Sequence, residues 1–149
     1  MSARSLGLSL AAGLLALAAF AAPAGAADRV YTEGPVSMVS SLRTEPGMFD
    51  EYLKYLASTY KQAMEAEKKA GLILDYRVYV TTPRGPDDPD IYLVTTYKDM
   101  AALDGLNEKM DPIQQQIFGD LAQRSAKTVE RGKMRTALGS QLIRRLDLK

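Results

Sequence analysis

The sequence predicts an α+β domain in which an antiparallel sheet is covered by helices on one face only. Residues 36–43, 72–82 and 91–97 have strand character, an amphipathic helix follows the first of them, and helical periodicity returns after the third. The expected order is therefore strand, helix, strand, strand, helix, strand, which is the split βαβ arrangement. Such a sheet leaves its other face to solvent, a ligand or a second subunit.

The first strand and the helix after it have clear boundaries. In residues 36–43, every second side chain starting from Val36 lies on one face. Glu45-Pro46-Gly47 ends that strand, and proline is tolerated in the first turn of a helix. From Phe49 onward, apolar residues recur at helical spacing, acids come first and lysines come last before Gly71. The helix macrodipole and the preference for a C-terminal glycine both favour this pattern.

The next two strands predict a hairpin. Residues 72–82 and 91–97 are rich in β-branched and aromatic residues, and the segment between them, 83–90, contains three prolines. A turn of this composition connects antiparallel neighbours. We expect Val80 to pair near Leu93.

The C-terminal third predicts a short helix, a longer helix and a last element of ambiguous type. Asp99 is placed to cap a helix from Met100 to Leu106, and Asp111-Pro112 to begin a longer one that ends near Gly132. Residues 138–148 fit a helix or a strand, and the glycine and serine near their start slightly favour a strand.

Residues 1–26 predict a cleaved signal peptide. Arg4 precedes an apolar run of 17 residues that ends at Pro23, and Ala24-Gly25-Ala26 offers small residues to a signal peptidase. Cleavage there, or one residue later, leaves a single domain, 27–149, that is periplasmic or secreted. An uncleaved anchor is the alternative, but this run is at the short limit for spanning a bilayer. We expect no stable membrane insertion after cleavage.

Missing residue types exclude several kinds of chemistry. The 149 residues contain no His, no Cys and no Trp. This composition excludes His-dependent catalytic units, His-ligated zinc or haem, disulfides, iron–sulfur clusters and thiolate nucleophiles. The acidic turn Asp87-Asp88-Pro89-Asp90 lacks the ligand spacing of a calcium loop. We therefore expect no metal site and no cofactor.

The C-terminal segment is basic. Residues 121–149 hold eight Lys or Arg and two acids, and four of the cations, Arg124, Lys127, Arg131 and Arg135, share one helix face. A basic face can bind nucleic acid or anionic lipid. Because an exported protein rarely meets nucleic acid, we expect no such partner and interpret the face as solvated.

A family resemblance adds to this pattern. A strand that runs into Glu45-Pro46-Gly47, an amphipathic helix, the 72–97 hairpin and Tyr97-Lys98-Asp99-Met100-Ala101-Ala102-Leu103 resemble the dimeric α+β barrel superfamily. The resemblance covers residues 36–106 well and the last third loosely. It implies a ferredoxin-like fold and a homodimer whose two bare sheet faces enclose a barrel that often holds a small ligand. The longer helix at 111–132 resembles exported members with no established activity.

The bare sheet face is the first candidate for a ligand site. Strict alternation along residues 72–82 assigns Leu74 to the helix side and Ile73 to the opposite side. An arginine flanked by tyrosines inside a barrel can bind a carboxylate or an enolate through two hydrogen bonds. The alternative is an ordinary strand with lateral ion pairs. The residues expected to line the site are Arg77, Tyr79, Tyr92, Asp75 and Arg43.

Three functions compete for this sequence. The first is an exported homodimer that binds a small organic molecule, to which Arg77 would add a preference for anions. The second is a cofactor-independent oxygenase or isomerase, with Tyr79 or Tyr92 as proton donor. Relatives with such activity commonly use His, Trp or Asn in the pocket, and the one Asn here, Asn107, lies outside the strands. The third is a purely structural dimer. The question of catalysis stays open, with binding favoured.

Overall fold

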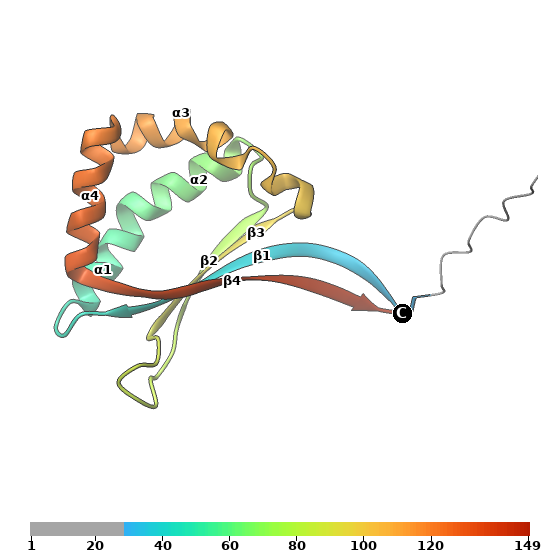
Figure 1. Ribbon diagram of the computed structural model, residues 1–149, viewed down its shortest axis with the longest axis horizontal. Coiled ribbons are helices and arrows are strands. Elements are labelled where there is room, and N and C mark those ends of the chain that lie inside the picture. Colours follow the sequence, from blue (N-terminus) through green and yellow to red (C-terminus); the bar gives the residue numbers. More distant parts are fainter. Residues whose placement is uncertain (1–28) are drawn as a thin grey trace, which may run out of the picture.

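The computed structural model describes residues 29–149, which form a four-stranded antiparallel sheet with helices on one face (Figure 1). The expected export signal lies outside the described residues. The order of strands across the sheet is β2-β3-β1-β4. The strands are β1 (Tyr31–Thr44), β2 (Asp75–Val80), β3 (Ile91–Tyr97) and β4 (Arg135–Leu148).

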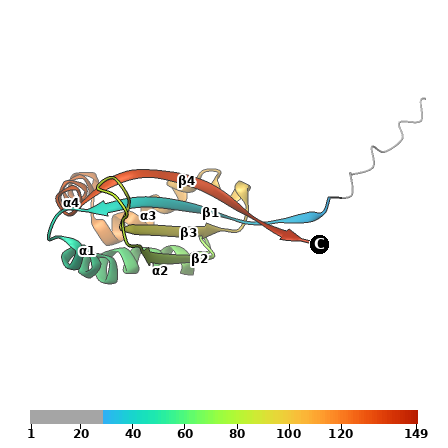
Figure 2. The ribbon, with the colours of Figure 1, turned by 90° about the horizontal axis from the view of Figure 1, so that it is seen from below.

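This strand order identifies the fold. The two strands that each precede a helical segment, β1 and β3, lie in the centre of the sheet, and β2 and β4 form its edges. The fold is ferredoxin-like. Figure 2 looks onto the face opposite the helices, where the strands run in the order β4, β1, β3, β2. The predicted α+β class and one-sided helix layer are confirmed.

The first helical segment has the predicted extent. It consists of α1 (Phe49–Tyr55), a π-helical turn η1 (Leu56–Tyr60) and α2 (Lys61–Lys69), one after another. Gly71 follows with a left-handed φ of 73°, a conformation that glycine adopts at the lowest cost. The π-helical turn was not predicted. Such turns interrupt α-helices frequently at functional sites.

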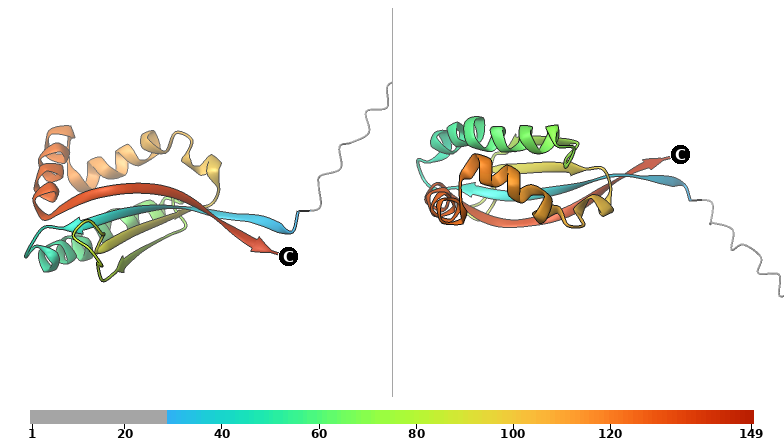
Figure 3. Two further views of the ribbon diagram at one scale, coloured as in Figure 1. Left: turned by 60° about the horizontal axis from the view of Figure 1, so that its bottom comes forward. Right: turned by 90° about the horizontal axis from the view of Figure 1, so that it is seen from above.

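The second helical segment corrects the prediction. No helix begins at Asp111-Pro112, because α3 (Leu106–Phe118) starts after Gly105, whose φ of 61° makes the turn, and Pro112 lies inside this helix. The helix ends at Gly119, and α4 (Leu121–Met134) continues in a new direction (Figure 3). One long helix was expected, and the chain forms two.

The capping residues explain the break between α3 and α4. The φ of 86° and ψ of −162° at Gly119 are incompatible with a helix. The Asp120 carboxylate then accepts a hydrogen bond from the backbone N–H of Gln123, whose side chain accepts one from the Asp120 N–H. This capping box starts α4. The cap predicted at Asp99 is confirmed, since Asp99 accepts from the Ala102 N–H at the start of the 3₁₀-helix η2 (Met100–Leu103), which ends three residues before the predicted Leu106.

The strand boundaries also differ from the sequence prediction. β1 is longer than residues 36–43, β2 is shorter than residues 72–82, and the ambiguous C-terminal element is a strand. The assignment of Ile73 and Leu74 was wrong: Ile73 is 3% exposed in the core, whereas Leu74 is 48% exposed. Both residues precede β2, so the strict alternation of a strand does not apply to them.

The core lies between the sheet and the helices as two clusters. Ile91 and Leu42 pack against Tyr52 of α1, and Val36 packs with Ile73 and Tyr97 near α2 and η2. The far ends of β1 and β4 extend past the helix layer as a two-stranded ribbon (Figures 1 and 2). In residues 29–149, no helix is long and apolar enough to cross a membrane.

Candidate functional site

All five predicted site residues belong to the side of the sheet that no helix covers. Directly paired residues share a face, and the register aligns Tyr79 with Tyr92 and Tyr92 with Ser41. The expected pairing of Val80 near Leu93 was wrong, because Val80 pairs with Ile91. A slip of two residues keeps every side chain on its face.

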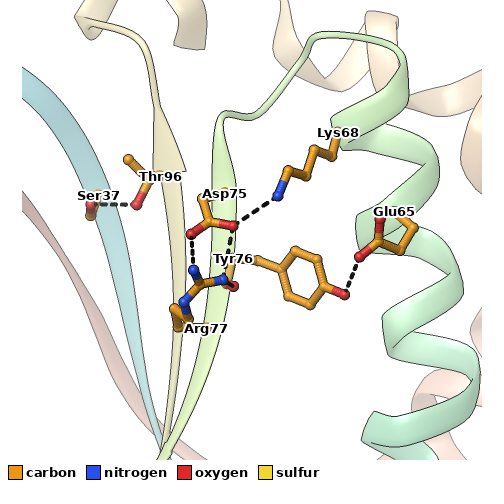
Figure 4. A network of polar contacts seen from close by, with 7 residues as sticks. All are labelled: Ser37, Glu65, Lys68, Asp75, Tyr76, Arg77 and Thr96. Atoms are coloured by element: carbon orange, nitrogen blue, oxygen red, sulfur yellow. Dashed lines mark hydrogen bonds and ion pairs between the residues drawn. The ribbon is translucent and has the colours of Figure 1, made fainter.

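The charged end of this face is already paired. Arg77 Nη2 lies 2.8 Å from Asp75 Oδ2, and Lys68 Nζ lies 3.0 Å from Asp75 Oδ1 (Figure 4). The Lys68 hydrogen bond lowers the pKa of the Asp75 carboxyl below its ordinary value. Asp75 therefore sits at the edge of the sheet between two cations. This geometry is the lateral ion pair that the sequence offered as the alternative for Asp75 and Arg77.

In the middle of the face, an apolar row of side chains lies next to a polar row. Val39 pairs with Val94 on β3, and the next row holds the Ser37 and Thr96 hydroxyls, 2.9 Å apart (Figure 4). Val39 is buried although no helix covers it. The face is therefore not a uniformly solvated surface.

The other end of the face holds aromatic hydroxyls and an arginine. Tyr79 is 54% exposed, and neither its phenol nor that of Tyr92 hydrogen-bonds another residue in the part of the chain described. Arg43 is 29% exposed and contacts only Asp87, at 3.5 Å, which is fully exposed itself. The register thus places Tyr79 and Tyr92 in one row, with Arg43 two residues beyond that row along β1 and Arg77 two residues before it along β2, whereas Asp75 lies at the start of β2.

The acidic side chains of the hairpin turn accept hydrogen bonds, mostly from backbone N–H groups. The Asp90 carboxylate accepts hydrogen bonds from the backbone N–H and the hydroxyl of Thr44, and Asp88 accepts from the N–H groups of Arg84 and Gly85. The Asp90 contacts tie the hairpin loop to the end of β1, and the Asp88 contacts hold the loop's own turn. Among residues 29–149, no three acidic side chains gather as metal ligands would.

A cavity that the sequence analysis missed lies inside the helix layer. It measures about 270 Å³ and lies between the first helical segment and the α3–α4 pair. Every residue that lines it comes from a helix and none from the sheet. The lining residues are Tyr55, Tyr60, Ala63, Met64, Glu67, Met110, Gln114, Phe118, Arg124, Lys127, Thr128 and Arg131.

The inner end of this cavity holds a buried acid. Glu67 is 2% exposed, and its carboxyl makes no hydrogen bond or ion pair with any described residue. Burial raises the pKa of this carboxyl to about 7, because burial disfavours the charged form. The Tyr60 hydroxyl is also buried and makes no hydrogen bond of normal geometry, and burial raises its pKa well above the usual range, an effect that the nearby Thr95 side chain partly offsets.

The other side of the cavity is cationic. Arg124, Lys127 and Arg131 of α4 line it, and the Nε atoms of both arginines are buried and unbonded. The interpretation of this helix face as solvated holds for Lys127, which is exposed, and was wrong for Arg124 and Arg131, which are half-buried. The turn at Gly119-Asp120 places α4 beside the first helical segment, so both arginines line the cavity.

Two sequence signals could have revealed this cavity. The Asp120-x-x-Gln123 spacing is a capping-box signature that begins a new helix after Gly119. Glu67 lies four residues after Ala63, on the stripe that packs inward, where an acid is out of place. Both features were present in the sequence and went unused.

Comparison with known proteins gives this chain neither a family nor an activity. No family model and no curated protein matches the sequence. The chain is similar to the crystal structure of HapK from Hahella chejuensis (10% identity, 72% of this chain and 90% of that chain, TM-score 0.49). It is also similar to the crystal structure of protein SO0527 from Shewanella oneidensis (18% identity, 78% of this chain and 96% of that chain, TM-score 0.46). A dimeric ferredoxin-like protein from an uncultured marine organism is similar as well (10% identity, 79% of this chain and 90% of that chain, TM-score 0.46).

Proposed function

We propose that this chain is exported and forms a homodimer that binds a small organic molecule between the bare faces of its two sheets. The observation that carries the proposal is the row of Tyr79, Tyr92 and Ser41, with Arg43 beside it, on a face without helices. Aromatic rings that offer hydroxyls, next to a cation, are typical of sites that orient a small polar ligand.

The edges of the sheet support dimerisation. β4 is a 14-residue edge strand, and most of its residues are exposed. A long exposed edge with apolar side chains invites pairing with another chain. Leu142, Ile143, Leu146 and Leu148 on this strand are all large, apolar and exposed. Ile143 pairs with Ser37 of the bare face, so a second copy placed against that face would cover Ile143 and enclose the tyrosine row.

The proposed ligand site lies where polar groups of the bare face have no strong partner within the protein. Arg43 has only the weak contact with exposed Asp87, so its guanidinium is available to a carboxylate or phenolate. Tyr79 and Tyr92 can donate or accept a hydrogen bond from either side of such a group. Arg77 lies in the next row of the same face, and Asp75 already holds its guanidinium.

Native mass spectrometry of the protein purified from the periplasm of an expression host tests the proposal. One spectrum reports the cleavage site, the oligomer and any retained adduct. We expect a homodimer, processed after Ala26 or Ala27, that carries a reproducible small adduct. A monomer, or a chain that keeps its first 26 residues, would contradict the proposal.

A pair of variants locates the adduct. Arg43→Gln removes the available cation of the bare face, and Arg84→Gln removes an arginine from the exposed hairpin loop as the matched control. We expect the adduct to be lost from the first variant and kept by the second. Equal retention in both would place the adduct away from the bare face.

A further inference from the structure

The cavity in the helix layer holds polar groups that the fold does not satisfy. Glu67 and Tyr60, from the first helical segment, are buried without hydrogen-bond partners among the described residues, and so are the Nε atoms of Arg124 and Arg131 from α4. A buried polar group without a partner costs about 1–3 kcal/mol, and more if it is charged. Few such groups occur in a folded protein, and here four of them border one cavity.

The existing partners of the α4 cations leave room for an anion. Arg124 has one ion pair, to the exposed Asp111 at 3.1 Å. Arg131 has no ion pair in the described part of the chain, and its Nη1 and Nη2 atoms contact only the hydroxyls of Tyr55 and Thr128. Lys127 lies 5.6 Å from the centre of the Phe118 ring. Three cations therefore line one side, and they do not neutralise Glu67.

The shape of the lining defines the class of ligand. Apart from its charged residues, the wall includes the apolar side chains of Met64, Met110 and Phe118. A volume of about 270 Å³ is near the lower limit of ligand pockets, which measure about 300–1,000 Å³. An occupant must therefore be small, with an anionic end, an apolar body and a polar group opposite the anion.

We propose that this cavity is a second binding site, separate from the barrel face, for a small organic carboxylate that bears a hydroxyl or carbonyl group at its far end. Arg124 and Arg131 bind the carboxylate, and Met64, Met110 and Phe118 contact the body. Glu67 and Tyr60 hydrogen-bond the far polar group. The π-helical turn η1 ends at Tyr60 and so borders the same site.

Isothermal titration calorimetry with 4-hydroxybenzoate, benzoate and 4-hydroxybenzamide tests the site in the full mature protein. The first probe has both polar ends, the second lacks the hydroxyl, and the third replaces the carboxylate with a neutral amide. We expect 4-hydroxybenzoate to bind at least about tenfold more tightly than either of the others, because each loses a hydrogen bond to a buried group. Equal affinities, or no binding of any probe at millimolar concentration, would overturn the proposal.

Variants on the two faces of α4 locate the binding. Arg131→Gln removes a cavity cation, and Lys133→Gln removes an exposed cation from the same helix as the matched control. We expect the first to weaken 4-hydroxybenzoate binding by about ten- to a hundredfold and the second to leave it unchanged. Equal binding by both would overturn the site. If Arg131→Gln fails to fold, Arg131→Lys is the alternative, because it keeps the charge but cannot form bidentate hydrogen bonds. We expect Arg131→Lys to bind 4-hydroxybenzoate with intermediate affinity.

Spectra of the wild-type protein separate this site from the barrel. Addition of 4-hydroxybenzoate should shift the backbone amide NMR signals of α2 and α4 and leave those of β2 and β3 in place. Shifts confined to the strands would overturn the second site and support the barrel. Shifts confined to the helices, in a protein that is monomeric by mass, would instead support the second site while the proposed function fails.

Discussion

The bare sheet face and the helix-layer cavity satisfy their polar groups in opposite ways. On the sheet face, Asp75 is bound by Arg77 and Lys68 at normal ion-pair distances, and all three are accessible to water. In the cavity, Glu67 is almost fully buried and has no hydrogen-bond or ion-pair partner among residues 29–149. Water screens charges on the face, so they cost little there, whereas the Glu67 carboxyl has lost water without gaining a partner.

The difference shows which observations point to a ligand. A charged residue on a strand is most often a solvated or paired one, as Arg77 is here. A buried group without a partner demands another explanation, because folding would otherwise have to tolerate its cost. Residue type and alternation led to the sheet face, while burial and missing partners lead to the cavity.

The largest expected effect separates the two faces of the sheet. Ile91 is fully buried under the helices, so Ile91→Ala should lower the free energy of unfolding of the protein by about 2–5 kcal/mol. Val94, half-buried on the bare face of the same strand, serves as the comparison. Urea denaturation at a low and a high protein concentration measures both. We expect the cost of Val94→Ala to grow with concentration, because the second copy of the proposed dimer would cover Val94. A cost for Val94→Ala that is independent of concentration would contradict a dimer built on this face.

The next effect tests the buried acid through pH. The pKa of Glu67 is about 7 in the folded protein, against an ordinary 4.5, so the folded state binds this proton more tightly than the unfolded chain. The free energy of unfolding must then fall as the pH rises from about 4.5 to about 7, by about 3 kcal/mol in total. Glu67→Gln removes the charge and should therefore be more stable than the wild type at pH 8, with little difference at pH 4.5.

An exposed acid on the same helical segment provides the control for this pH effect. Glu51 is exposed on α1 and paired only with Lys54, so Glu51→Gln should change the unfolding free energy little at either pH. Thermal or urea unfolding at pH 4.5 and pH 8 gives all the required values. Parallel behaviour of Glu67→Gln and wild type across this range would mean that the Glu67 carboxyl is hydrated or paired in solution.

Local sequence patterns were sufficient to predict the sheet, but they were not sufficient to predict the cavity. Local patterns determine a strand such as residues 91–97 and a helix end such as Gly71, and those predictions agree with the structure. Five candidate residues also reached the expected face, because alternation tolerates an even slip in register. The cavity instead depends on the turn at Gly119, which changes the direction of a helix. Only after that turn do Arg131 and Glu67 face one interior space, although they are far apart in the chain.

The turn between α3 and α4 can be weakened to test how the cavity is held open. Asp120→Ala removes the side chain that accepts from the Gln123 N–H and should cost about 1 kcal/mol of stability. Gly119→Ala should cost more, because its φ of 86° disfavours a Cβ atom and that atom would meet Gln123 Oε1 at 1.7 Å. Both variants should also weaken 4-hydroxybenzoate binding, which calorimetry would measure. Unchanged binding with reduced stability would mean that α4 keeps its position without the cap.

The smallest expected effect concerns Arg77, the residue that sequence reasoning placed at the centre of the site. Because its guanidinium is exposed and already paired with Asp75, Arg77→Ala should lower the unfolding midpoint slightly at low ionic strength and not at all at high salt. Native mass spectrometry of the same variant should still show the dimer and its adduct, in contrast to Arg43→Gln. Loss of the adduct from Arg77→Ala would mean that this guanidinium reaches the ligand while Asp75 holds it. The ion pair would then position a binding group, and the sheet face would resemble the cavity more closely than its exposed charges indicate.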